Sequence, residues 1–529
     1  MVLPTVHLMT ESRYKFFLTA IFLTCGILGL TSLHLRELWT DEGYRLMIMA
    51  GGRTWSQQMA AADSASFRDV LFAVGPELYQ PLFYALGNLL FHLLGDVSVS
   101  ALRIANVACL LLGLWGLLRL ARPWPPLARL FLLFLFGTSG SIVMHTMQIR
   151  EYPLYLTTSI WSIAFYFELF DAPPGPWKQT AVPWAGYALT GILGYYTHTF
   201  FLLILLAQLL FIPFRKQGRR AFALQICSAI FCVALAALPW LLFLDAKFPN
   251  RSNSTWIAPT KPREISAFLT GLKVGFRLLF TYFDSRPNLR GWLLVNIRTL
   301  DTWLILATLT VFATLARLFR KPRSADPRAL FAALTALIFL AFQLGWYFAK
   351  DDLILFPRYF LGYYIGLTML AAFGFHHLYV AAQQTPAASL AIRGLIGLTV
   401  IAGILQIHNY RVFPYADTSI SSVCGWREIS ANLSTRVRPG DTIIYYHPLQ
   451  AWTLSEGFRT PAVETNSWAV ANGTLPKTPT IWALDTHVEP AMWTKSYAAL
   501  VAAGYRQTSK EKIGCLADLI RYEITPPGL

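Results

Sequence analysis

The feature that most constrains this chain is a series of apolar runs, each long enough to approach the width of a lipid bilayer. Of the 529 residues, 55% are hydrophobic and only 14% are charged, and a soluble protein of this size would carry more charge. A membrane-spanning helix needs about 20 predominantly apolar residues to cross the hydrocarbon core. Such runs are predicted at 14–34, 100–120, 127–145, 152–170, 183–197, 199–214, 221–243, 294–316, 328–348, 358–381 and 386–407.

These runs predict an all-α polytopic membrane protein with about 11 transmembrane helices. The first run follows Arg13 and Lys15 but lacks a small-residue cleavage site, so it is interpreted as a retained anchor. The pair within 183–214 is the least regular, because each half is short. Residues 1–407 are therefore predicted to form one transmembrane domain.

Basic residues gather in short loops that a cytoplasmic N-terminus would place on the cytoplasmic side. An odd number of spans places the tail after 407 on the opposite face, together with two large loops, 35–99 and 244–293. We expect a multi-pass protein of the cell inner (cytoplasmic) membrane whose C-terminal domain is periplasmic or extracellular. The loops explain much of the net charge of +16, so nucleic acid is not an expected partner. The basic loops contain Arg119 to Arg129, Lys178, Arg215 to Arg220, and Arg317 to Arg328.

The tail, 408–529, is predicted to form a small α/β domain outside the membrane. Apolar residues at helical spacing predict a helix over 426–437, and 491–503 resembles a second helix. Two apolar runs, 442–446 and 480–484, predict buried strands. Alternating helices and strands are typical of a layered α/β domain, which we interpret as a lid or an acceptor-docking module. Cys424 and Cys515 both fall in this domain, and a disulfide between them remains open.

An acidic pair, Asp41 and Glu42, follows the first span at the predicted membrane boundary. Charged residues at membrane depth are costly and are usually functional when they face the interior of a helix bundle. The alternative is an ordinary solvated pair on a loop. The same outer loop contains the apolar stretch 82–94, which is too short to span and is predicted to lie in the interface.

Basic residues in the outer loop 244–293, among them Lys261 and Arg263, contradict the usual charge asymmetry of membrane proteins. Anion binding is the simplest explanation, although contact with lipid headgroups would explain them equally well. Arg358 follows Pro357 at the start of a predicted span, where either phosphate binding or anchoring is possible. Arg150 lies at another boundary and has the same two interpretations.

Several short motifs follow one another along the chain. They are Asp41-Glu42-Gly43-Tyr44, Gln80-Pro81-Leu82-Phe83-Tyr84, Gly95-Asp96, Ala101-Leu102-Arg103, Gln148-Ile149-Arg150-Glu151-Tyr152, Tyr196-Thr197-His198 and Pro357-Arg358-Tyr359. Their order resembles the bacterial branch of the GT-C integral-membrane glycosyltransferases, which are relatives of protein O-mannosyltransferases and of the lipid A aminoarabinose transferase. The resemblance covers roughly residues 10–410, and each motif is short.

The resemblance implies transfer of a sugar from a polyprenyl-phosphate donor to an acceptor on the outer face. It assigns Asp41 as the base or acceptor-orienting acid, with Glu42 beside it. It also carries the arginine and tyrosine of a family motif to Arg150 and Tyr152. The family usually has an acid where this chain has Gln148, which leaves Glu151 as a possible substitute.

The chemistry of such a transfer is consistent with these residue types. A carboxylate can deprotonate an incoming hydroxyl or amine, and a departing lipid phosphate needs cations or a metal ion. The cations available for donor-phosphate binding are Arg150, Lys261, Arg263 and Arg358. His198 is a candidate substrate or metal contact, although a lone histidine is more often a satisfied polar residue. No cofactor is certain, and a divalent metal ion remains open.

A polytopic transporter or lipid flippase is the main alternative, because it too would have many spans around a cavity. Transporters typically carry paired charges near the bilayer midplane and often internal repeats. This chain has few charges within its predicted spans and no evident repeat. A non-catalytic scaffold ranks third, since the acid Asp41 is present. The sugar and the acceptor, whether lipid, glycan or protein, are not identified by the sequence.

Overall fold

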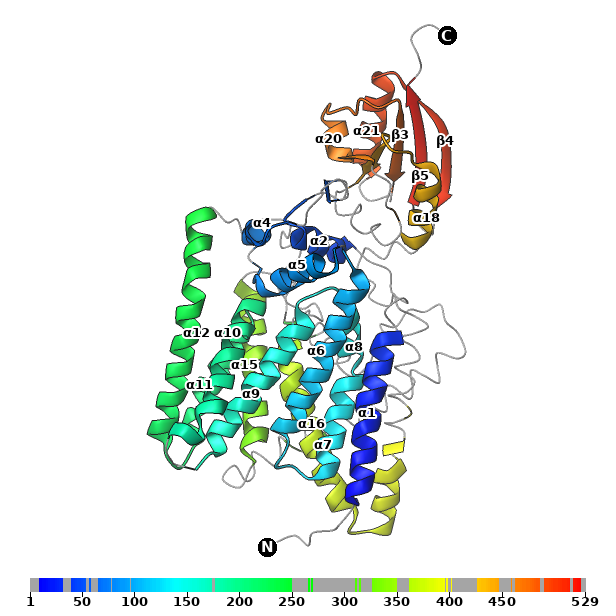
Figure 1. Ribbon diagram of the computed structural model, residues 1–529. Helices are drawn as coiled ribbons and strands as arrows, with labels where there is room; N and C mark the ends of the chain where they lie inside the picture. Colours follow the sequence, from blue (N-terminus) through cyan, green and yellow to red (C-terminus); the bar gives the residue numbers. More distant parts are fainter. Residues whose placement is uncertain are drawn as a thin grey trace. The chain divides into compact units, whose positions relative to one another are not determined.

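The computed structural model shows a helical bundle and a small C-terminal sheet (Figure 1). Five of the described helices are long and apolar enough to cross a membrane, or six if one bent pair counts as a span. The protein is therefore a multi-pass membrane protein. The described residues are 9–31, 40–53, 57–58, 65–77, 79–95, 97–173, 177–249, 265–266, 268–269, 310–311, 314, 326–349, 361–394, 396–397, 401, 426–446, 458, 462–485, 490–513 and 517–524.

The chain forms two compact units: residues 1–33 with 103–416, and residues 34–102 with 417–529. The predicted span at 294–316 lies for the most part outside the described residues, and the end of the predicted span at 386–407 does too, so the total number of spans stays a prediction. The predicted domain boundary between 407 and 408 also lies outside them.

The first unit is a helical bundle whose helices match nine of the predicted apolar runs to within a few residues. Three of them, α7, α9 and α15, have proline in their first two positions, where the missing N–H breaks no helical hydrogen bond. The bundle contains α1 (Glu11–Thr31), α6 (Val99–Leu120), α7 (Pro126–Thr138), α8 (Gly140–Met147), α9 (Tyr152–Asp171), η2 (Trp177–Gln179), α10 (Ala181–Thr197), α11 (Phe201–Phe211), η3 (Ile212–Phe214), α12 (Arg219–Lys247), α15 (Pro327–Ala349) and α16 (Leu361–Ala382).

The apolar run predicted as one span over 127–145 is broken in the structure. Helices α7 and α8 meet at an angle of 54°. Ser139, with ψ near 127°, leaves the helical conformation and is followed by Gly140. Small and flexible residues such as Gly and Ser are common where helices kink sharply. Hydrophobic periodicity cannot reveal such a break, because the apolar character continues through it.

Helix α9 lies between α6 and α10 and contacts both. Gly116 of α6 permits this approach, because a Cβ there would lie 2.8 Å from Cγ2 of Ile160 in α9. The hydroxyl of Thr157 donates to the carbonyl of Cys109 across the same interface, at 2.6 Å. Small residues and interhelical hydrogen bonds replace the hydrophobic driving force, which is weak between helices within a bilayer.

A buried amide ties α9, α10 and α11 together. Gln208 accepts a hydrogen bond from Tyr187 Oη at 2.9 Å and donates one to Ser162 Oγ at 3.1 Å. The hydroxyl of Tyr166 donates to the backbone carbonyl of Gln208 at 2.9 Å. Because all four of these residues are buried, the network stabilises the fold most when each of its polar atoms has a hydrogen-bond partner.

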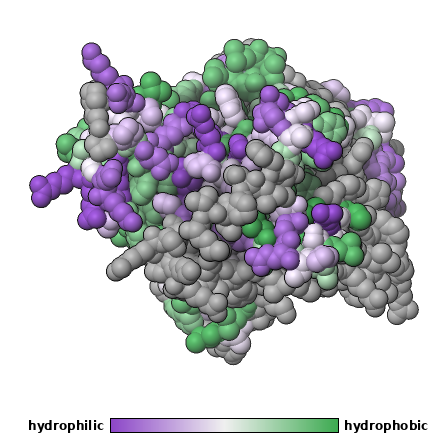
Figure 2. Space-filling model, turned by 90° about the horizontal axis from the view of Figure 1, so that it is seen from below, coloured by the Kyte–Doolittle hydropathy of each residue, from purple (hydrophilic) through white to green (hydrophobic). Residues whose placement is uncertain are grey.

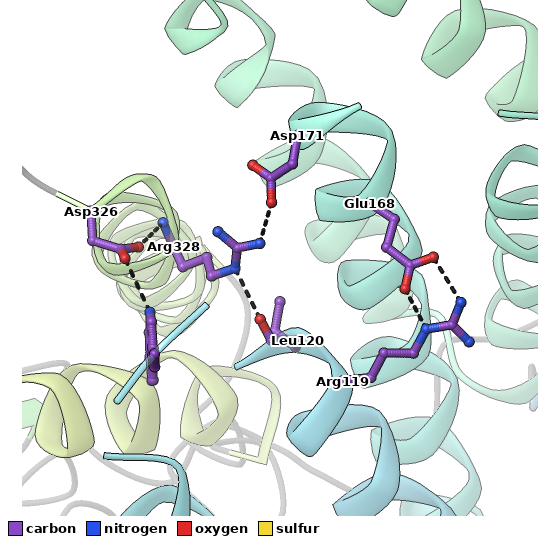
Figure 3. Close-up of polar contacts among 7 residues, drawn as sticks. Arg119, Leu120, Glu168, Asp171, Asp326 and Arg328 are labelled. Carbon is purple, nitrogen blue, oxygen red and sulfur yellow. Dashed lines mark hydrogen bonds and ion pairs between the residues drawn. The ribbon is translucent and has the colours of Figure 1, made fainter. Parts of the chain in front are cut away.

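Arginine side chains connect the helices at one end of the bundle, which we call the basic end. It comprises the ends of α6, α9 and η3 and the start of α15. Figure 3 shows the contacts of Arg119 and Arg328 at this end. Arg119 pairs with Glu168 through two hydrogen bonds, the longer being 2.8 Å. Arg328 pairs with Asp171 and donates to the carbonyl of Leu120 at 2.9 Å.

Arg215 completes this end by donating to the carbonyls of Leu169 and Ala172, at 2.7 and 2.6 Å. These oxygens belong to the last turn of α9, where carbonyls lack partners within the helix. A cation there also complements the negative end of the helix dipole. Arginines therefore fix the C-terminal end of α9 from several neighbouring segments.

The second unit contains a group of short helices from the first predicted outer loop. They are α2 (Thr40–Met49), α4 (Phe67–Val74), η1 (Gly75–Glu77) and α5 (Leu82–Leu94). Helix α5 matches the predicted helix over 82–94, whose position in the membrane interface stays a prediction. Asn88 of α5 donates to the carbonyls of Met49 and Ala65, at 2.9 and 3.0 Å, and so joins the helices.

A capping box begins α4. The hydroxyl of Ser66 accepts from the N–H of Asp69, and the Asp69 carboxylate accepts from the N–H of Ser66 at 3.0 Å. These hydrogen bonds from Ser66 lower the pKa of Asp69.

The tail forms a five-stranded sheet of order β2-β1-β3-β5-β4, with helices beside it (Figure 1). Strands β1, β2 and β3 are parallel, whereas β5 is antiparallel to β3 and β4. The predicted helices and strands of the tail are all found, so it is a small α/β domain. Its elements are α18 (Trp426–Arg436), β1 (Thr442–Tyr445), β2 (Val463–Asn466), α20 (Ser467–Ala471), β3 (Thr480–Asp485), α21 (Pro490–Ala502), β4 (Tyr505–Ile513) and β5 (Ala517–Ile524).

The core of this domain lies between one face of the sheet and helices α20 and α21. Trp493 of α21 is almost fully buried there against Ile444, Ile481 and Ile520. Tyr497 donates to Asp485 at 2.7 Å, and burial together with this carboxylate raises the pKa of Tyr497. Cys424 and Cys515, the predicted disulfide candidates, lie outside the described residues.

Candidate functional site

Helix α2 begins with the predicted acidic pair. Asp41 lies in its first turn, and its side chain falls outside the described set. Glu42 is fully buried, with a relative exposure of 0%. A carboxylate withdrawn from solvent needs polar or charged surroundings, which excludes the alternative of a solvated loop residue for Glu42.

Arg45, one turn after Glu42 on α2, is also buried. Its guanidinium carbon lies 4.1 Å from the ring centre of Tyr79 and 5.8 Å from that of Tyr84. A guanidinium over aromatic faces is stabilised by the ring quadrupole, most strongly where water is excluded. Tyr79 and Tyr84 of the first predicted outer loop therefore pack against the Arg45 guanidinium, a role that the sequence did not suggest.

The Gln-Ile-Arg-Glu segment, 148–151, forms a non-helical link between α8 and α9. Arg150 and Glu151 are buried within the first unit, at 1% and 5% exposure. Irregular backbone at membrane depth is tolerated where it is enclosed by protein or lines a cavity. Burial also argues against the interpretation of Arg150 as a residue that reaches out to lipid headgroups, because a snorkelling side chain would be exposed.

Aromatic rings and histidines surround this link. The guanidinium carbon of Arg150 lies 5.8 Å from the ring centre of Tyr152. The Tyr152 ring contacts both His145 and His198, with centroids 4.9 and 5.8 Å apart. Tyr155, one turn further along α9, contacts His198 at 5.0 Å. The structure thus brings together three of the predicted residues: Arg150, Tyr152 and His198.

A hydrogen-bond chain that was not predicted orients His145 and the link. The Nδ1 atom of His145 lies 2.8 Å from Oε1 of Gln148, and Asn106 of α6 donates to the Gln148 carbonyl at 2.5 Å. Gln148 occupies the position where the family usually has an acid, and here its side chain contacts an imidazole. The separation of three residues between His145 and Gln148 was the available sequence signal, since it is short enough for the two side chains to meet at the end of a helix.

His198 lies at the end of α10, where the chain turns into α11. Its Nδ1 atom accepts a hydrogen bond from the N–H of Phe200 at 3.1 Å, so Nε2 carries the proton of the neutral ring. The ring is partly exposed. His198 can therefore serve as a hydrogen-bond donor beside Tyr152 and Tyr155.

The other predicted phosphate-binding residues, Lys261, Arg263 and Arg358, lie outside the described residues. Within the described part of the chain, no group of three His, Cys, Asp or Glu side chains is placed to hold a metal ion. Within the first unit the candidate site is therefore described from the buried Arg150 and Glu151, two histidines and tyrosine rings. These groups can bind a phosphate and hydrogen-bond a polar substrate.

Solved structures of membrane glycosyltransferases share this fold. The apo structure of ArnT from Cupriavidus metallidurans has a TM-score of 0.58 and 14% identity, over 96% of this chain and 98% of that one. The ArnT structure bound to undecaprenyl phosphate has a TM-score of 0.57 and 12% identity, over 97% and 99%. The archaeal oligosaccharyltransferase AglB from Archaeoglobus fulgidus, in complex with an inhibitory peptide and a dolichol-phosphate, has a TM-score of 0.53 and 11% identity, over 98% and 75%.

The chain therefore has the GT-C fold of these glycosyltransferases. No protein-family model matches the sequence, and a search of curated proteins found no significant match.

Proposed function

We propose that this protein is a glycosyltransferase that moves a sugar from a polyprenyl-phosphate donor to an acceptor outside the cytoplasmic membrane. The observation that carries the proposal is the buried, non-helical link at the start of α9, which places Arg150 among tyrosines and histidines in a GT-C fold. A buried cation with hydrogen-bond donors around it is suited to the anionic phosphate of a lipid-linked sugar.

In the proposed reaction, Asp41 accepts the proton of the acceptor hydroxyl or amine as the new glycosidic bond forms at the anomeric carbon. The bond from that carbon to the donor phosphate breaks, and the lipid phosphate leaves with the electron pair. Glu42, buried on the same helix turn, orients Asp41 or the acceptor. A general base of this kind typically contributes about 100- to 10,000-fold to the rate.

The donor phosphate is assigned to Arg150 and Tyr152, assisted by Lys261, Arg263 and Arg358. Arginine matches the geometry of phosphate oxygens and stays charged at every physiological pH. His198 contributes a hydrogen bond to the sugar or the phosphate, and Glu151 balances the local positive charge. Support for a lipid-phosphate ligand comes from the similar fold of ArnT, which was solved bound to undecaprenyl phosphate.

We further propose that the transmembrane domain, 1–407, carries the chemistry and that the tail, 408–529, faces the periplasm or the exterior. The tail then serves as a lid or as a docking surface for the acceptor. In this arrangement Asp41 and Glu42 lie at the outer membrane boundary, where a lipid-linked donor presents its sugar.

The catalytic proposal is tested by Asp41→Asn in purified protein reconstituted with a polyprenyl-phosphate sugar and an acceptor extract. We expect transfer to fall by at least about 100-fold while donor binding persists. Glu42→Gln is the matched comparison and should retain more activity, since Glu42 only orients. Full transfer by Asp41→Asn would eliminate Asp41 as the base.

The donor proposal is tested by native mass spectrometry of the detergent-purified wild type, Arg150→Ala and Arg358→Ala. A polyprenyl phosphate or its sugar conjugate retained by wild type and lost in the arginine variants would support the assignment. Bulk phospholipid alone in all three proteins would contradict it. That result would favour a polytopic transporter or lipid flippase, for which reconstituted transport is the direct assay.

A further inference from the structure

The buried arginines of the basic end bring several loops together. Arg215 hydrogen-bonds the last carbonyls of α9, and Arg328 bonds both Asp171 at the end of α9 and Leu120 at the end of α6 (Figure 3). Gln225, near the start of α12, donates to Thr180 at the start of α10 at 2.9 Å. The turns that follow α6, α9 and η3 therefore occupy one end of the bundle (Figure 1).

The acidic residues of this end already have cationic or hydrogen-bonding partners. Glu168 pairs with Arg119 and Asp171 pairs with Arg328. Asp326 accepts from Trp124 Nε1 at 3.1 Å and from the N–H of Arg328 at 2.7 Å. Carboxylates that are committed to these contacts cannot also neutralise the cations of the surrounding turns.

Five basic residues remain exposed on the same turns. Among the described residues none of them forms an ion pair with a carboxylate, and only Arg219 has a side-chain hydrogen bond, to the Arg215 carbonyl. Seen from this end of the bundle, the described surface shows hydrophilic residues beside hydrophobic ones (Figure 2). The exposed cations are Arg122, Lys178, Lys216, Arg219 and Arg220.

Apolar side chains flank these cations. Phe214 in η3 is 52% exposed, directly before the basic turn, and Val182 at the start of α10 is 73% exposed. Apolar groups beside Lys and Arg are typical of segments at the boundary between acyl chains and headgroups. A pocket for a free anion would instead surround one point with donors, whereas these cations are distributed over three turns.

We propose that the exposed cations of the basic end bind the headgroups of anionic phospholipids in the leaflet that this end faces. Each Lys or Arg near such a surface gains attraction to the negatively charged lipids, and this gain weakens as salt screens it. The proposal does not rest on transferase activity, because it concerns the opposite end of α9 from Arg150. It assigns a preference for anionic lipid to specific turns of the protein.

The test uses native mass spectrometry of the full-length protein with equal amounts of phosphatidylglycerol and phosphatidylcholine of identical acyl chains. The test variant combines Lys178→Gln, Lys216→Gln and Arg220→Gln, none of which has a side-chain ion pair to lose in the described structure. The control combines Lys477→Gln, Lys495→Gln and Arg506→Gln, which are exposed in the C-terminal domain. Both variants remove the same charge, and both should retain the wild-type unfolding temperature.

We expect wild type and control to retain more phosphatidylglycerol than phosphatidylcholine. In the test variant the ratio of bound phosphatidylglycerol to bound phosphatidylcholine should fall by at least about five-fold. Raising the salt concentration from about 0.05 to 0.5 M should reduce the wild-type preference, since the Debye length shortens. Equal preference in the test variant and wild type would overturn the proposal. Displacement of the lipid by millimolar inorganic phosphate would also overturn it, because a free-anion pocket would then explain the binding.

Discussion

The two ends of α9 carry charged residues under very different conditions. At its C-terminal end, Glu168 and Asp171 pair with arginines, and a third arginine hydrogen-bonds the last carbonyls. At its N-terminal end, Arg150 and Glu151 lie in a non-helical link and are surrounded by rings. The first arrangement is what a stable helix end requires, whereas the second offers polar groups in a setting suited to a ligand.

The comparison teaches that burial alone does not identify a functional charge in this fold. Arg328 and Arg150 are both buried, yet Arg328 has a helix carbonyl of α6 and a carboxylate of α9 as its partners. Arg150 instead lies beside the ring of Tyr152, which in turn contacts His145 and His198, whose rings can donate or accept a hydrogen bond. The chemical type of the neighbours separates the two ends.

The most direct test of this comparison removes one arginine at a time, first at the N-terminal end of α9 and then at its C-terminal end. We expect Arg150→Ala to reduce sugar transfer by at least about 100-fold, since a cation that stabilises a leaving phosphate is removed. The unfolding temperature of Arg150→Ala is measured beside its activity, because Arg150 is buried and its loss can also lower stability. The measurement is kcat/KM for a polyprenyl-phosphate sugar, with Arg119→Met as the control that should keep most of its activity. A wild-type kcat/KM in Arg150→Ala would end the functional interpretation of this link.

At the other end, Arg328→Met should lower the free energy of unfolding by about 2 kcal/mol while the activity of the folded protein persists. The estimate lies below that of a fully buried pair, because the side chain of Asp171 is 44% exposed. A double-mutant cycle with Asp171→Asn measures the coupling between the two residues. The Arg119–Glu168 cycle is the comparison and should give a smaller value, as both of its side chains are partly exposed. Zero coupling in the Arg328 cycle would contradict a structural role for the pair.

The Gln208 network beside the middle of α9 extends the comparison, because its hydrogen bonds involve no charged group. Tyr187→Phe removes the hydrogen bond to Gln208 Oε1 and should cost about 1 kcal/mol of stability, with little effect on transfer. Chemical denaturation in detergent measures the stability, and the same transfer assay measures the activity. A large loss of activity with unchanged stability would mean that function extends into the bundle interior.

The smallest expected effect concerns a capping box remote from both ends. Ser66→Ala should destabilise α4 by about 1 kcal/mol, seen as faster amide hydrogen exchange in residues 67–74. The hydrogen bonds of Ser66 lower the pKa of Asp69, so the ionised carboxylate is favoured in the folded state. The ionised Asp69 carboxylate contributes to stability above the pKa of about 3.9 that an aspartate has in the unfolded chain, and this contribution is lost as the pH falls through the lowered pKa of the folded state. Protection of α4 should thus be unchanged from pH 7 to 5 and decline below about 4; a decline already at pH 6 would implicate another group.

Much of the fold could be predicted from the sequence, because apolar runs and helical spacing report directly on membrane helices and on a buried sheet. Strand β1 and helix α21 were predicted almost to the residue. Strand β4 was missed, since Arg506, Lys510 and Lys512 on its exposed positions hide any apolar alternation. The break between α7 and α8 was missed for the opposite reason, because apolar residues continue across it.

The candidate site could be predicted only in part. Arg150, Tyr152 and His198 were identified from short motifs, and the structure brings them together. His145 was missed, although its spacing from Gln148 was visible in the sequence. The pairing of Arg119 with Glu168, 49 residues apart, could not be read from the chain, because such pairs depend on how the helices pack. The side chain of Asp41 falls outside the described residues, so its role stays a prediction.

The arginine that joins α15 to the end of α9 has a consequence for biosynthesis. Arg328 meets Asp171 across 157 residues and the Leu120 carbonyl across 208. Neither contact can exist until the ribosome has made α15, long after α6 and α9 have left the exit tunnel. Helices α6 and α9 are therefore synthesised before the arginine that contacts their ends, and this end of the bundle is completed late. A nascent chain that stops before residue 328 would keep Asp171 without this arginine partner.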